Sequence, residues 1–148
     1  MIAMTEIDRQ VRAVIYRTLL EQGRAPSVAS LASLLDVTES RVTASLRALA
    51  GAHAIVLRPG TDELWMAHPF SAVQTDFAVR SGIRTWFANC VWDGLSILAM
   101  VGDGTLDTHS PATGERLRFE VRDRIVSGEG LVHFLVPAAR FWDDIAFT

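Results

Sequence analysis

The chain has 148 residues, 49% of them hydrophobic, which is enough for a packed core and excludes a chain that is disordered throughout. The formal net charge is −3: residues 1–60 contribute 7 − 5 = +2 and residues 61–148 contribute 7 − 12 = −5, so neither part is basic enough to predict a polyanionic partner. No apolar stretch reaches the roughly 18 residues that cross a bilayer, and the start of the chain lacks the pattern of a signal peptide, so we expect a cytoplasmic protein with no membrane partner.

Three helices are predicted in the first third of the chain. Each has apolar side chains at helical spacing and a serine or threonine that can cap its start. They cover residues 5–22, 28–35 and 39–50, with Thr5, Ser27 and Thr38 as the caps. Two short apolar runs, 54–57 and 64–67, then predict a β-hairpin with a six-residue loop from Arg58 to Glu63.

Helices followed by a hairpin are typical of a winged helix, so residues 1–67 are predicted to form a winged-helix-like N-terminal domain. A helix that reads DNA needs basic side chains for phosphates. The free face of the third helix offers Arg41 and Arg47 and no lysine. We therefore expect a packing or dimerisation module rather than a DNA-binding one, with a winged-helix transcriptional regulator as an alternative. The pattern predicts no particular oligomeric state.

Pro69 marks the predicted boundary to a second domain, residues 68–148, of class α+β. A buried helix containing Cys90 is expected within residues 84–100, because large aromatic and aliphatic side chains recur there at spacings of three and four. The remaining segments predict a small mixed or antiparallel sheet packed on that helix. The expected strands cover residues 73–79, 105–109, 116–122 and 131–136, and a turn or short helix covers 137–145.

Cys90 and Asp93 are the candidate reactive pair. Cys90 is the single cysteine, which excludes an intramolecular disulfide and any multi-cysteine metal site. A thiolate is a nucleophile and a soft metal ligand, and a carboxyl group three residues away on a helix can take up the thiol proton and return it. Two plainer alternatives remain: Cys90 as a small buried hydrophobic residue, and Asp93 as a helix cap or a partner of Arg84.

The segment around this pair resembles the alkylmercury (organomercurial) lyase family. The resemblance lies in an aromatic residue, Cys90, two residues, Asp93, a small residue and Leu95, within Trp86-Phe87-Ala88-Asn89-Cys90-Val91-Trp92-Asp93-Gly94-Leu95. The stretch from Thr108 to Leu117 is similar to the next loop and strand of that family, and the winged-helix-like N-terminus is similar to its layout.

The resemblance implies cleavage of a carbon–mercury bond by protonolysis, giving a hydrocarbon and mercuric ion. Cys90 is then the attacking, mercury-binding thiolate and Asp93 the proton relay. Family members use a second cysteine, and this chain has Thr148 at or beside its place and Ser110 where some members have a further cysteine. No resident cofactor is implied, since mercury is substrate and product, and a cellular thiol is the expected second sulfur donor.

Alternatives to a lyase stay open at this point. Because the second cysteine is missing, a non-catalytic relative that binds mercury or a small apolar ligand is one of them. A zinc site is not expected, because the four histidines lack the short spacing of ligand pairs. These histidines, His53, His68, His109 and His133, are expected at the surface or in hydrogen bonds.

Overall fold

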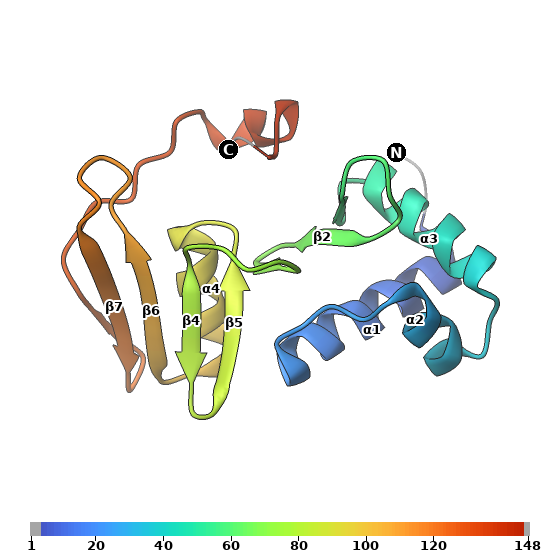
Figure 1. Cartoon of the computed structure of the whole chain (residues 1–148), viewed down its shortest axis with the longest axis horizontal. Coiled ribbons are helices and arrows are strands. Elements are labelled where there is room, and N and C mark those ends of the chain that lie inside the picture. Colours follow the sequence, from blue (N-terminus) through green and yellow to red (C-terminus); the bar gives the residue numbers. More distant parts are fainter. Residues whose placement is uncertain (1–3, 147–148) are drawn as a thin grey trace.

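Residues 4–146 are described by the structure, a computed structural model in which helices pack beside one antiparallel sheet (Figure 1). The α+β class predicted from the sequence is confirmed. The three predicted N-terminal helices are also confirmed, as α1 (Glu6–Gln22), α2 (Val28–Leu35) and α3 (Glu39–Gly51). Within residues 4–146, no helix combines the length and apolar character needed to cross a membrane.

The predicted caps begin these helices. Thr5 and Asp8 form a reciprocal capping box at the start of α1, and the side chains of Ser27 and Thr38 accept backbone N–H groups at the starts of α2 and α3. Asp8 also accepts a 2.6 Å hydrogen bond from Ser45 of α3, which joins the first and third helices. Local capping and helical periodicity therefore account for the N-terminal third.

Eight strands form one sheet in the order β1-β2-β3-β5-β4-β6-β7-β8, and every neighbouring pair is antiparallel. The strands are β1 (Val56–Leu57), β2 (Leu64–Ala67), β3 (Phe70–Ser71), β4 (Ala78–Ser81), β5 (Arg84–Ala88), β6 (Gly104–His109), β7 (Arg116–Arg122) and β8 (Ile125–Ser127). The predicted hairpin at 54–67 is confirmed as β1 and β2. Helix α4 (Val91–Val101) packs on the sheet through β3, β4, β5 and β6.

The helix predicted within residues 84–100 begins later than expected. Residues 84–88 form strand β5, in which Trp86 and Ala88 are buried and the intervening side chains are more exposed. This alternation has the period of a strand, and it was hidden by aromatic residues that also fit helical spacing. Helix α4 therefore starts at Val91, and Cys90 is its N-cap instead of an interior residue.

Two strand predictions were also wrong. Residues 73–77 form no strand, and β4 starts only at Ala78, where pairing with β5 and β6 begins. Residues 131–136 are not a strand either, because Phe134 leaves the sheet and packs against Trp92 and Phe141 instead. The predicted C-terminal turn is confirmed as a short 3₁₀ helix, η1 (Ala138–Asp143).

The predicted domain boundary lies in the turn between β2 and β3. Ala67 and Phe70 pair across this turn, and the sheet continues through it from β1 to β8. One connected group of buried side chains extends from Val11 and Leu46 in the helices to Ile97 and Leu106 beside the sheet. The division into residues 1–67 and 68–148 stays a prediction.

Trp86 is the main link between the helices and the sheet. It is 3% exposed, and its indole N–H is 2.9 Å from the carbonyl oxygen of Leu19 and 3.1 Å from that of Leu20, near the end of α1. Helix α1 ends at Gly23, whose φ is 70° and where a Cβ atom would lie 2.3 Å from the carbonyl oxygen of Thr85. Only glycine permits this close approach of α1 to β5.

Replacing Trp86 with alanine should therefore lower the free energy of unfolding by about 3–5 kcal/mol, because a cavity opens and two helix carbonyls lose their donor. Trp86→Phe should cost about 1–3 kcal/mol, mainly through the lost hydrogen bond. Urea denaturation measures both. The matched control is Trp92→Ala, at a site 57% exposed, which should cost about 1 kcal/mol or less. Equal losses at both positions would contradict this account.

Candidate functional site

Cys90 lies where strand β5 passes into helix α4. Its backbone is extended, with φ −152° and ψ 178°, and its Sγ accepts the backbone N–H of Asp93 at 3.4 Å. The sequence analysis placed both residues on one helical face, whereas Cys90 is the cap and Asp93 the third residue of the helix. The two residues are still brought together, because an N-cap side chain points back at the first turn.

The thiol is held in its neutral form. Burial raises the pKa of Cys90, and the negative charge of Asp93 adds to the rise, while the backbone N–H groups of Asp93 and Trp92 partly offset it. A cysteine at a helix N-terminus more often has a lowered pKa. Cys90 therefore keeps its proton at neutral pH until an electrophile draws the sulfur into a bond.

Asp93 is bound by two side chains from outside its helix. Its Oδ2 accepts a 3.0 Å hydrogen bond from the amide of Asn89 and lies 3.2 Å from Nδ1 of His68. The side chain of Asp93 is 16% exposed and that of His68 34%. Arg84, which the sequence offered as a partner, is at the far end of β5 and makes no ion pair with Asp93. The carboxylate of Asp93, the imidazole of His68 and the amide of Asn89 therefore lie in mutual contact, and the thiol of Cys90 lies beside the backbone of Asp93.

His68 comes from the turn between β2 and β3. Its carbonyl oxygen accepts a 3.0 Å hydrogen bond from the hydroxyl of Tyr16 on α1. The amide of Asn89 lies 3.3 Å from His68 Nδ1 and also approaches the carbonyl oxygens of Pro69 and Phe70. The sequence analysis missed Asn89 and treated His68 as an ordinary histidine. No spacing signals a contact across 25 residues, and only the proline beside His68 marked the turn.

Aromatic side chains from the C-terminal segment lie beside His68 and Trp92. In Figure 1 this segment, at the red end of the colour bar, runs past the ends of the strands and back toward the helices. Trp142 of η1 meets His68 edge-on, with ring centroids 6.1 Å apart, and stacks on His53 at 4.3 Å. Trp92, in the first turn of α4, borders a cavity of about 570 Å³ whose other lining residues are Phe134, Leu135, Val136, Pro137, Ala138 and Phe141. An apolar surface thus adjoins the turn that carries Asp93.

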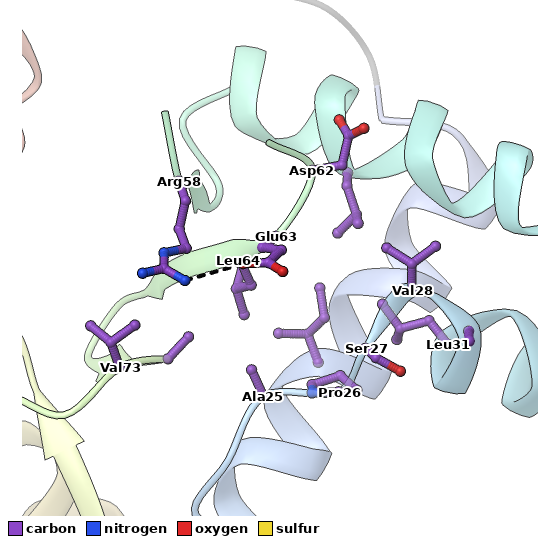
Figure 2. A pocket seen from close by; sticks show the side chains of 14 residues that line it. Ala25, Pro26, Ser27, Val28, Leu31, Arg58, Asp62, Glu63, Leu64 and Val73 are labelled. Carbon is purple, nitrogen blue, oxygen red and sulfur yellow. Dashed lines mark hydrogen bonds and ion pairs between the residues drawn. The ribbon is translucent and has the colours of Figure 1, made fainter. Parts of the chain in front are cut away.

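A second cavity, of about 430 Å³, lies between the helices and the β1–β2 hairpin (Figure 2). Its walls are mainly apolar, and the ion pair of Arg58 and Glu63 lies at one side. Asp62, also on its edge, binds Arg47 of α3 through two hydrogen bonds. Neither Cys90 nor Asp93 lines this cavity. The ion pair with Asp62 neutralises Arg47, one of the two arginines of α3 that could have bound DNA phosphates.

The arrangement suits chemistry at a single thiol. In the part of the chain from residue 4 to residue 146, no three side chains of His, Cys, Asp or Glu gather into a group able to hold a metal ion. Ser110, which the resemblance placed at a further cysteine position, accepts the N–H of Thr113 within its own turn. Thr148, placed at or beside the second cysteine position, lies outside the described residues. Cys90 is thus the thiol available for attack, with Asp93 beside it.

The model of the alkylmercury lyase family matches residues 70–148, which is more than half of the chain and includes Cys90, Asp93 and Asn89. The chain belongs to the alkylmercury lyase family. A search of curated proteins found no match. The family is one of carbon–mercury lyases.

The fold is also similar to a crystal structure of the mercury-bound form of MerB2. The TM-score is 0.61 and the sequence identity 23%, over 82% of this chain. The chain covers 66% of the length of that structure. At this identity the likeness shows a shared α+β fold and no more.

Proposed function

We propose that this chain cleaves carbon–mercury bonds of organomercurials by protonolysis, with Cys90 as the mercury-binding nucleophile and Asp93 as the proton relay. The observation that carries the proposal is the contact of the Cys90 sulfur with the first turn of α4, where Asp93 lies, inside the segment matched by the family. A thiol and a carboxylate held together in this way supply both a soft ligand and a proton acceptor.

The first step forms a sulfur–mercury bond. The sulfur of Cys90 binds mercury, the original anionic ligand of the organomercurial leaves, and the thiol proton passes to Asp93. Because burial raises the pKa of Cys90, its thiol is still protonated when the substrate binds. The proton needed later at carbon is therefore brought into the site by the protein itself.

The second step breaks the carbon–mercury bond. A thiolate from a cellular thiol adds to mercury, the electron pair of the bond stays with carbon, and carbon takes the proton from Asp93. The products are the hydrocarbon and mercuric ion held between Cys90 and the added thiolate. A second molecule of the thiol then binds mercury in place of Cys90 and gives its proton to the Cys90 sulfur, so that a mercury dithiolate leaves and the thiol of Cys90 is restored. The outside thiol takes the place of the second cysteine, since the sequence has one cysteine.

The substrate class follows from the surface beside α4. The cavity bordered by Trp92 is lined mainly by apolar side chains, with Phe134 and Phe141 among them. Such a surface favours an apolar organic group on mercury, aryl or alkyl, over a charged one.

The direct test measures benzene release from a phenylmercury salt by gas chromatography, with and without an excess of a small thiol. We expect repeated turnover with thiol and, without it, a stable adduct of one phenylmercury per chain. If benzene does not appear even with thiol while phenylmercury stays bound, the protein is a non-catalytic mercury-binding relative and the lyase proposal is wrong.

A further inference from the structure

The two oxygens of the Asp93 carboxylate have different surroundings. Oδ2 receives the amide of Asn89 and faces Nδ1 of His68, at 3.0 and 3.2 Å. No hydrogen bond within residues 4–146 involves Oδ1, although the side chain is only 16% exposed. One oxygen is therefore anchored by two groups, and the other is free to exchange a proton.

We propose that His68 and Asn89 are positioning residues: they anchor Oδ2 of Asp93, fix the rotation of the carboxylate, and leave Oδ1 as the oxygen that carries the proton between Cys90 and the substrate carbon. This inference rests on the proposed function for its chemistry. It assigns a role to two residues outside the Cys90–Asp93 pair.

The anchor is itself held from three sides. Tyr16 of α1 binds the backbone of His68, Trp142 of η1 meets its ring edge-on, and the sheet pairs Phe70 of β3 with Ala88 of β5. That pairing brings the turn carrying His68 next to Asn89. A carboxylate bound to groups fixed in this way loses little further freedom when it reacts, which is how preorganised sites gain rate.

His68 acts through one nitrogen. Its Nδ1 makes the contacts with Asp93 and Asn89, whereas Nε2 is buried and has no hydrogen-bond partner within the described residues. The tautomer with hydrogen on Nδ1 donates to the carboxylate, and nothing in the arrangement requires Nε2. A side chain that keeps a hydrogen-bond donor at the position of Nδ1 should therefore be able to perform the role of His68.

This asymmetry makes a sharp test possible. The amide nitrogen of asparagine can occupy the place of Nδ1, while that of glutamine reaches the place of Nε2. We expect His68→Asn to release benzene at nearly the wild-type rate, and His68→Gln and His68→Ala to lower kcat by about 10–100-fold, as is typical when an outer partner of a reactive group is lost. Phenylmercury binding should stay at one per chain in all three variants.

The matched control is His53→Asn. His53 stacks on the same Trp142 but belongs to the loop before β1, and Asp93 makes no hydrogen bond to it. Its replacement should leave the rate unchanged, so that a loss at His68 cannot be attributed to the Trp142 packing. Equal rates for the asparagine and glutamine variants of His68, or an unchanged rate in His68→Ala, would overturn the positioning role.

A second readout keeps this test separate from the lyase proposal. Asp93 is the charged side chain that acts on Cys90, and His68 is the titratable side chain in contact with Asp93. Without His68 the Asp93 carboxylate is no longer held at one distance from the Cys90 sulfur, so the pH midpoint of Cys90 alkylation by iodoacetamide should move in His68→Ala and His68→Gln and stay in place in His68→Asn. Should the wild type release no hydrocarbon, this profile still decides the role of His68: a midpoint that does not move in the alanine variant contradicts it.

Discussion

Replacing Cys90 with serine is expected to abolish both retention of phenylmercury and release of benzene. A serine hydroxyl does not ionise near neutral pH, and its oxygen is a hard ligand with little affinity for mercury. Without the sulfur–mercury bond, the thiol proton that Asp93 would carry is also missing. Mass spectrometry of the intact protein measures the adduct, and gas chromatography measures the hydrocarbon.

The serine variant is a well-matched control for folding. Sγ of Cys90 caps helix α4 by accepting the N–H of Asp93, and serine is among the preferred N-cap residues. The stability of Cys90→Ser should therefore equal or slightly exceed that of the wild type, whereas Cys90→Ala should lose about 1 kcal/mol with the cap. Benzene release at the wild-type rate by the serine variant would mean that the reaction does not pass through Cys90.

Replacing Asp93 with asparagine should separate binding from bond cleavage. Asparagine has the same shape, and its amide oxygen can still accept from Asn89, so the first turn of α4 should keep its structure. It cannot take up and return a proton. We expect one phenylmercury bound per chain and hydrocarbon release slowed by about 10²–10⁴-fold, the usual contribution of a positioned proton donor.

Single-turnover measurement gives this result most directly, because the adduct with Cys90 should accumulate in Asp93→Asn and decay in the wild type. Asp107, on strand β6 of the sheet that packs against α4, provides a comparison. Its two ion pairs, with Arg80 and Arg118, hold its pKa below the usual range, Arg118 contributing most. Asp107→Asn should lower stability modestly and leave the rate of release unchanged. A wild-type rate in Asp93→Asn would remove Asp93 from the proton path.

Helices and strands could be predicted from the sequence wherever the spacing of apolar residues fitted only one of the two. Helical periodicity and the caps Thr5, Ser27 and Thr38 gave the boundaries of α1, α2 and α3, because these signals operate within a few residues of each other. The prediction failed at residues 84–88, where the burial of Trp86 and Ala88 has the period of a strand but the aromatic and aliphatic residues of the longer segment 84–100 fit helical spacing. Residues 84–88 form a strand because they pair with β3 and β4. Such pairing depends on the whole sheet and not on the local sequence.

The candidate site divides in the same way. The sequence by itself determined that the single cysteine and one carboxyl group lie three residues apart, in a segment that resembles alkylmercury lyases. Only the tertiary structure decided which groups hold that carboxyl. His68 meets Asp93 because β3 pairs with both β2 and β5, so that a turn 25 residues away comes to lie at the start of α4. A contact made by strand pairing leaves no periodic trace in the chain, since the residues that produce it are the buried ones of the strands and not the ones that touch.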